Sequence, residues 1–310
     1  MSANLYLRIS GQNQPFFNAS VTFSLGQLAH SFRATIPFMA INQPLKVEWF
    51  LDDTRLFKGQ IDSVDEAIDG KTISIAGRSQ SANFIDSRIK TDALYSQSFE
   101  SILATLLKDY GLGVQNNVKQ AVADIPEFQI NAQSPFSEIA QLAKHRNLHL
   151  IERNGAIQIE RPGQFAVQNL VLEEGKNLEN LTIKRNWSQV YHTYEIQNGW
   201  DTGEATATYA PADKSRKCVI IADKLQDQQA CQDRAEYEKN LAIAKTLTVS
   251  AKVPGLYKEL SNSAINKMVQ VKVPSRTYSE KLLIKSITMN QSESEKATDI
   301  ELFRPFMEIE

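Results

Sequence analysis

The strongest constraint on this chain is its succession of short alternating segments separated by turn dipeptides. Apolar residues occupy every second position in residues 5–9 and again in residues 21–25. Asp69-Gly70 and Asn154-Gly155 are turn-prone pairs, and each stands between two such segments. A period of two places apolar side chains on one face of a strand, so the sequence predicts antiparallel sheets with one buried face.

Composition narrows the class of protein. Hydrophobic residues make up 42% and charged residues 23% of 310 residues, which is ordinary globular usage for about two domains. The formal net charge is −2 and no Lys/Arg run exceeds two residues, so we expect neither nucleic-acid recognition nor binding to an anionic membrane. No run approaches the ~18 apolar residues of a membrane helix, so we expect no membrane insertion.

The N-terminal residues and the cysteines indicate the cellular compartment in which the protein is made. Residues 1–10 alternate like a strand and contain no apolar core of a signal peptide. Cys218 and Cys231 are the two cysteines, too few for a disulfide framework or a cysteine zinc site. We therefore expect the protein to be made in a reducing cytoplasm.

Domain boundaries follow from changes in periodicity. Residues 1–92 are predicted to form a first antiparallel β-barrel domain. Residues 93–172 are predicted to form a small α+β module, with one helix capped by Ser98 and ended by Gly111 and a second begun by Ser134 and Pro135. The Asn154-Gly155 hairpin completes this module, because both residues tolerate the positive φ of a type I′ turn.

Strand character then returns. Residues 173–200 and 246–310 are predicted to form a second β-barrel domain, which includes a strand near Tyr194. Residues 201–245 are predicted to be a helical insertion, with a polar helix at 224–244 whose apolar stripe is thin. The predicted fold class is α+β and mainly β: two similar antiparallel β-barrel domains flank a small α+β module, and a helical insertion interrupts the second.

An internal similarity supports this duplicated architecture. Ile61-Asp-Ser63-Val64, followed by Ile73-Ser-Ile75 and Arg78, resembles Ile284-Lys-Ser286-Ile287, followed by Ile300-Glu-Leu302 and Arg304. A valine-containing strand and a hairpin precede both segments, at Val47 and at residues 269–273. We interpret the similarity as two copies of one β domain.

Residues that could carry chemistry do not form a recognisable pattern. His145 and His149 have the spacing of metal ligands on one helix, but Asn147 is expected to end that helix between them. Asp52-Asp53 and Glu173-Glu174 are adjacent pairs, and neighbouring residues on a strand point to opposite faces.

Other motifs fail for similar reasons. Gly111-Leu-Gly113 follows a helix and lacks a third glycine, so it is not a dinucleotide loop. Trp49, Trp187 and Trp200 could form a sugar platform, but tryptophans in β-rich chains more often pack between layers. We predict no catalytic, cofactor-binding or metal site and no cofactor, and we expect the protein not to be an enzyme.

The order of these segments resembles a known family. The hairpin of residues 50–61 resembles one in phage baseplate hub proteins, and Gly77-Arg78-Ser79 with the downstream Asp86 is similar to a segment of Mu-like 43-kDa tail proteins. The helix after Ser98, the Asn154-Gly155 hairpin and the helix at 234–240 follow in the order of that family.

This resemblance implies a structural role in a virion. It implies a homotrimeric hub in the baseplate of a contractile phage or prophage tail, assembled in the bacterial host cytoplasm. Two similar barrels per subunit would make a ring of six that adapts a three-fold tail spike protein to six-fold tail tube proteins. The family supplies no catalytic residues.

The sequence leaves two other functions open, one as a binding module and one as an enzyme. A carbohydrate- or peptidoglycan-binding module could use the tryptophans and the α+β module. A baseplate glycosidase would need two carboxylates about 5–9.5 Å apart across a cleft.

Overall fold

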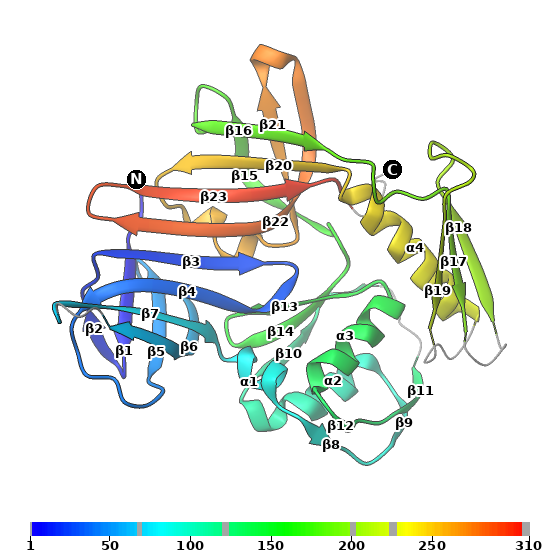
Figure 1. Cartoon of the computed structure of the whole chain (residues 1–310), viewed down its shortest axis with the longest axis horizontal. Helices are drawn as coiled ribbons and strands as arrows, with labels where there is room; N and C mark the ends of the chain where they lie inside the picture. Colours follow the sequence, from blue (N-terminus) through cyan, green and yellow to red (C-terminus); the bar gives the residue numbers. More distant parts are fainter. Residues whose placement is uncertain (1, 67–69, 120–123, 199–202, 223–227, 306–310) are drawn as a thin grey trace.

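In the computed structural model, the residues described are 2–66, 70–119, 124–198, 203–222 and 228–305. Figure 1 shows a long stack of strands with a helical module below it and a small outlying sheet beside it. The strands are β1 Leu5–Ile9, β2 Gln12–Gln14, β3 Asn18–Ser24, β4 Gln27–Pro37, β5 Lys46–Leu51, β6 Thr54–Glu66, β7 Thr72–Ser79, β8 Ile89–Lys90, β9 Leu94–Gln97, β10 Gly113–Asn116, β11 Ile125–Phe128, β12 Asn131–Gln133, β13 His149–Arg153, β14 Ala156–Glu160, β15 Phe165–Glu173, β16 Asn180–Arg185, β17 Thr193–Gln197, β18 Glu204–Thr208, β19 Lys217–Ile221, β20 Leu247–Pro254, β21 Lys267–Val273, β22 Tyr278–Ser292 and β23 Lys296–Phe303. The α-helices are α1 Ser81–Asp86, α2 Phe99–Leu107, α3 Pro135–His145 and α4 Gln228–Ala244, and the short 3-10 turns are η1 Lys108–Tyr110, η2 Lys258–Leu260, η3 Asn262–Ala264 and η4 Pro274–Arg276.

Two groups of six strands have the same order. The first β unit, as we name it, contains the strands β1 and β3–β7, paired in the order β3-β4-β7-β6-β5-β1. The second β unit contains β15, β16 and β20–β23, paired in the order β16-β20-β23-β22-β21-β15. Each strand of one unit therefore has an equivalent in the other, taken in chain order. The first strands differ in direction, since β1 is antiparallel to β5 and β15 is parallel to β21.

The two units also agree in register. One row of paired residues crosses the first unit through Val21, Phe32, Gly77 and Ile61. The equivalent row crosses the second unit through Ile183, Val249, Leu302 and Ile284. A register shift follows Ile61 in β6, before Ser63, and follows Ile284 in β22, before Ser286. These positions are β-bulges, which insert one extra residue into a strand.

The internal similarity seen in the sequence thus corresponds to equivalent strands, with one correction. Val64 pairs with Ile75, and its equivalent Ile287 pairs with Ile300. Ile75 is therefore the counterpart of Ile300, whereas the sequence comparison had aligned Ile73 with Ile300. Side chains alternate with a period of two, so an offset of two residues preserves the buried face and leaves the pattern unchanged.

The two units are joined edge to edge. β3 pairs antiparallel with the second half of β22, from Ser24 opposite Ser286 to Asn18 opposite Ser292. This junction makes one continuous sheet from β16 to β2. A single apolar core cluster runs through both units and includes Phe23, Trp49 and Leu302.

The expectation of two closed barrels is therefore not met. In the part of the chain that the structure describes, the pairing order of each unit is an open path. β3 gives its outer edge to β22 of the other unit, so that edge is not available to β1 or β2. Between β15 and β16 the described residues make only an isolated bridge, from Glu174 to Leu178.

The middle module has its own apolar core, contributed by α1–α3 and short strands. The sequence predicted its local structure correctly: Ser98 accepts a hydrogen bond from the Ser101 amide (3.1 Å) at the start of α2, and Gly111 ends η1 with a φ of 63°. Ser134 caps α3. Asn154 and Gly155 both have positive φ, as the type I′ turn requires.

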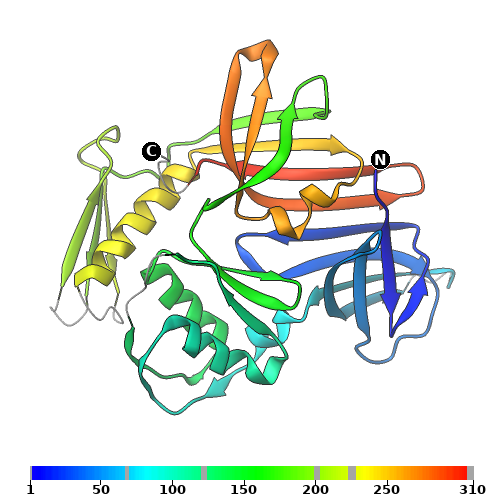
Figure 2. The same ribbon diagram turned by 180° about the vertical axis from the view of Figure 1, so that it is seen from behind.

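The insertion contains more than a helix. Residues 228–244 form α4, the described part of the predicted helix. The expected strand at Tyr194 lies in β17, which pairs with β18 and β19 in a separate three-stranded sheet rather than in the second β unit. Figures 1 and 2 show this sheet against α4, at the side of the molecule. Among the helices described, none combines the length and the apolar character needed to cross a bilayer.

Candidate functional site

The β13–β14 hairpin of the middle module carries a buried ion pair. Arg153, in β13, and Glu160, in β14, are 6% and 1% exposed, and Arg153 Nη1 lies 2.5 Å from Glu160 Oε1. Gln158 also accepts a hydrogen bond from Arg153 Nη1. Buried charges are tolerated when they are paired and hydrogen-bonded on all sides, and this pair meets that condition.

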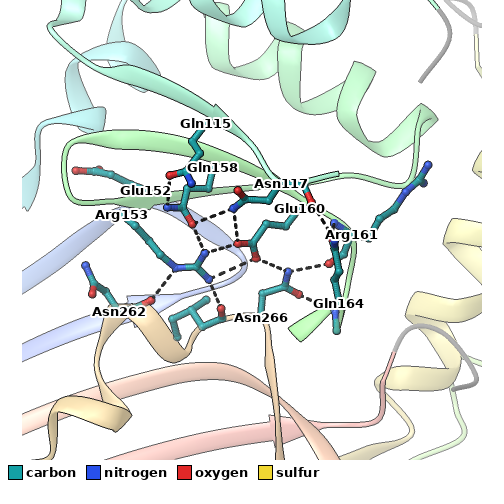
Figure 3. A network of polar contacts seen from close by, with 12 residues as sticks. Gln115, Asn117, Glu152, Arg153, Gln158, Glu160, Arg161, Gln164, Asn262 and Asn266 are labelled. Atoms are coloured by element: carbon teal, nitrogen blue, oxygen red, sulfur yellow. Dashed lines mark hydrogen bonds and ion pairs between the residues drawn. The ribbon is translucent and has the colours of Figure 1, made fainter. Parts of the chain in front are cut away.

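Asn117 of the middle module donates to Glu160 Oε1 (3.2 Å), and further partners of this pair come from the second β unit. Figure 3 shows the Arg153 guanidinium between Glu160 and the loop that carries Asn262 and Asn266. Arg153 Nε donates to the Asn262 carbonyl (3.2 Å), and Arg153 Nη2 donates to the Ile265 carbonyl. Asn266 Nδ2 donates to Glu160 Oε2 at 3.0 Å. The ion pair therefore fixes the hairpin to the loop between β20 and β21.

Asn266 suits this place for a backbone reason. Its φ is 65°, in the left-handed region that asparagine tolerates better than most residues, and its side chain is fully buried. Its Oδ1 accepts from the Gly163 amide (3.1 Å), and its Nδ2 also donates to the Arg161 carbonyl (3.0 Å). One amide side chain of this loop thus satisfies two backbone groups of the segment that follows β14.

The residue before Arg153 connects the hairpin to the first β unit. Glu152 Oε2 accepts hydrogen bonds from Ser79 Oγ (2.5 Å) and from Ser81 Oγ. His30 Nε2 lies 2.8 Å from the Glu152 carbonyl oxygen, and the His30 amide donates to Ser79 Oγ at 2.9 Å. Burial lowers the pKa of His30, so the ring is neutral at pH 7.

Successive residues on a strand point to opposite faces, so Glu152 and Arg153 reach different units. The hairpin therefore holds all three parts of the molecule in one arrangement. Neither Glu152 nor Arg153 has a local sequence pattern that indicates this role. A charged residue in an alternating hairpin normally faces solvent. Here the first β unit lies against Glu152, and the loop between β20 and β21 lies against Arg153.

The histidines considered as metal ligands lie on different elements. His145 ends α3, and His149 begins β13. Among the residues that the structure describes, no group of three His, Cys, Asp or Glu side chains could hold a metal ion. Burial lowers the pKa of His149 to about 4.

The paired carboxylates have structural partners. Asp52 Oδ1 accepts from the Asn4 amide (2.9 Å) at the β5–β6 turn, where Asp52 has a φ of 49°. Glu174 accepts hydrogen bonds from the amide and the hydroxyl of Ser275, and these bonds lower its pKa. Glu173 pairs with Lys176 at 2.9 Å.

Of the two tryptophans that the structure describes, Trp49 is not available for the platform that the binding alternative needs. Trp49 is completely buried, where its ring packs against Phe16 and Phe32. Trp187 is 56% exposed, and Trp200 lies outside the described residues. Cys231 is buried and Cys218 is half-buried; burial raises the pKa of Cys218, which disfavours its reactive thiolate form.

A pocket of about 300 Å³ lies where α3 and α4 meet the second β unit. Its apolar lining includes Phe136, Leu241 and Phe303, and Lys144 and Lys245 also contribute to it.

No family model matches the chain. The baseplate hub protein gp44 of Escherichia phage Mu is 24% identical over 212 residues, which cover 60% of this chain. The crystal structure of the 43 kDa tail protein of prophage MuSo2 from Shewanella oneidensis superimposes with a TM-score of 0.82 over 97% of this chain and 98% of that one, at 21% identity.

The chain has the fold of the Mu-like prophage tail proteins. A tail protein from Neisseria meningitidis MC58 has the same fold, with a TM-score of 0.82 at 13% identity over 98% of this chain and 97% of that one. The resemblance to Mu-like 43-kDa tail proteins expected from the sequence is thereby confirmed. The chain spans 54% of the length of gp44, so about half of that curated relative is matched.

Proposed function

We propose that this protein is a structural hub in the baseplate of a contractile phage or prophage tail. Three copies form a ring that adapts a three-fold spike to the six-fold tail tube. The observation that carries the proposal is the duplication: the two β units agree in strand order, register and bulge position. Three chains contribute six such units, which is the number that a six-fold partner requires.

The similarity to the Mu baseplate hub protein gp44 supports this placement. The partners in this proposal are the tail spike protein on one side of the ring and the tail tube proteins on the other. The protein then resides in the virion, after assembly in the bacterial host cytoplasm. The ring is built from open β units joined through their edges rather than from closed barrels.

The proposed role is structural and not enzymatic. The buried Arg153–Glu160 pair is fully engaged in holding modules together, and the carboxylate pairs considered for catalysis serve turns and loops. The similar proteins are named as tail and hub components, which agrees with this role.

The test is the native mass of the purified protein, measured by light scattering after gel filtration. We expect three chains of 34.8 kDa each, and particle images with six similar lobes around one axis. A monomer at every concentration contradicts the proposed ring. In that case, a titration with peptidoglycan fragments, monitored by the tryptophan fluorescence of the protein, would test the binding alternative.

A further inference from the structure

Two strands of the shared sheet, β16 and β6, have an edge without a strand partner among the described residues. β16 pairs with β20, and its other edge has no partner among the described strands. β6 pairs with β5 only as far as Gln60, so from Asp62 to Glu66 no described strand pairs with one of its edges, while β7 covers the other. An open edge presents a row of backbone donors and acceptors that another strand can pair with.

These two edges are equivalent to two that already pair with each other. β16 is the counterpart of β3, and β6 is the counterpart of β22. β3 and β22 form the junction between the two units within the chain. The duplication thus supplies a second junction of the same kind, β16 with β6, which the single chain leaves unmade.

One chain does not bring these edges together. Six strands separate β16 from β6 in the pairing order, so the two are about 33 Å apart along the sheet at the usual strand spacing. Figures 1 and 2 show β16 and β6 toward opposite ends of the stack. The strand that completes the junction therefore has to come from another molecule.

We infer that the open edge of β16 in one chain pairs antiparallel with residues 62–66 of β6 in a second copy of this chain. The pairing repeats the register of the β3–β22 junction. The inference rests on the proposed function for the number of copies in the ring, and it adds which strands and which residues meet.

The register follows from the equivalent rows. Thr288 lies opposite Thr22 in the β3–β22 junction, with their hydroxyls 3.1 Å apart. Asp65 follows Val64 as Thr288 follows its counterpart Ile287, so Asp65 is equivalent to Thr288. Lys184 follows Ile183 as Thr22 follows its counterpart Val21, so Lys184 is equivalent to Thr22. The intermolecular junction therefore places Asp65 opposite Lys184, where the internal junction has two threonines.

Charge supports this pairing. The open edge of β6 carries Asp65 and Glu66, and the open edge of β16 carries Lys184 and Arg185. Asp65, Glu66 and both basic residues are exposed in the single chain. Opposite charges on facing strands stabilise the pair and exclude the pairing of two β6 edges or two β16 edges.

The apolar residues agree as well. Val64 and Ile183 are half-buried in the single chain, whereas their counterparts Ile287 and Val21 are fully buried at the internal junction. In the inferred register Val64 faces Arg185 and Ile183 faces Glu66, so the aliphatic stems of these two charged side chains cover the two apolar ones, and their opposite charges are diagonal neighbours. The contact joins two different surfaces, so repetition of it closes a ring or extends a filament rather than forming a two-fold dimer.

The first test is disulfide trapping in the full-length chain. Asp65→Cys/Lys184→Cys should oxidise to cross-linked dimers and trimers on non-reducing gels. Thr22→Cys/Thr288→Cys is the matched control for geometry, because it should form the same disulfide within one chain. Asp65→Cys with Asn180→Cys is the control for register, and each single variant is the control for Cys218 and Cys231.

The second test uses charge reversal. Asp65→Lys should weaken self-association about tenfold or more, because it places a third positive charge beside Lys184 and Arg185. Asp65→Lys/Lys184→Asp should restore most of it. Lys217→Asp, an exposed change in β19, is the matched control and should leave the mass unchanged.

The outcomes separate the two levels of the argument. A trimer that cross-links through residues 65 and 184, and not through 65 and 180, supports the inference. A wild-type trimer without this cross-link, while Thr22→Cys/Thr288→Cys oxidises fully, overturns the inference and leaves the proposed ring intact. A wild-type monomer overturns both.

Discussion

The buried ion pair allows one prediction to be worked through in detail. Arg153→Met removes the cation beside Glu160 and leaves a carboxylate that is 1% exposed. Breaking a buried pair from one side costs about 3–5 kcal/mol of the free energy of unfolding. Glu160 keeps the Asn117 and Asn266 amides as donors (3.2 and 3.0 Å), which reduces the cost. The Asn262 and Ile265 carbonyls lose their donor, which raises it. We expect about 4 kcal/mol.

The companion variant is Glu160→Gln, which leaves Arg153 charged but bound to two carbonyls and to Gln158. We expect it to cost about 2 kcal/mol. The double variant should cost no more than Arg153→Met alone, because neither charge then remains unpaired. This corresponds to a coupling free energy of about 2 kcal/mol between the two side chains.

The measurement is guanidinium unfolding followed by circular dichroism, at one protein concentration, because association contributes to apparent stability. Arg88→Met, an exposed arginine of the middle module, is the matched control and should change stability by less than about 0.5 kcal/mol. If the effects of Arg153→Met and Glu160→Gln simply add, the reasoning about this pair is refuted.

Two further predictions concern the loss of stability at acid pH and the close strand packing at Gly77. Stability should fall as the pH drops from 6.5 toward 4, because the unfolded chain binds a proton that folded His149, with a pKa of about 4, does not; His149→Gln should flatten this part of a pH–stability profile by up to about 3 kcal/mol. Gly77→Ala should cost about 2–3 kcal/mol in a denaturation experiment, because its Cβ would lie 2.0 Å from the Gln60 carbonyl oxygen; Gly26→Ala, which meets only Ser24 Oγ at 3.9 Å, should be nearly neutral, and equal costs would contradict the steric account.

Local chemistry was predictable from the sequence, and long-range pairing was not. Ser98, Ser134 and Asn154-Gly155 act through hydrogen bonds or φ preferences within a few residues, so a single chain segment contains the whole signal. The partnership of β3 with β22 has no local signal, since each strand alternates in the same way whichever strand lies beside it.

The same limit explains the two main differences from expectation. Alternation shows that residues 18–24 form a strand with one buried face, but it does not show whether the outer edge closes a barrel or joins another unit. The buried contacts of the β13–β14 hairpin were not predictable either, because Glu152 and Arg153 receive their partners from segments far away in the chain. The role of these two residues can be recognised only when the two β units and the middle module are placed together.

The edge pairing of β3 with β22 has a consequence for synthesis of the protein. Ser24 and its partner Ser286 are roughly 260 residues apart, so at usual elongation rates the ribosome needs roughly 10–50 s to deliver the second strand after the first. During this time the nascent first β unit exposes the apolar row at Val21 and Phe23 without its final neighbour. On a crowded polysome, several such chains lie side by side with the same open edge. The rate of translation therefore competes with association between unfinished chains, and the yield of folded protein depends on how soon β22 is made.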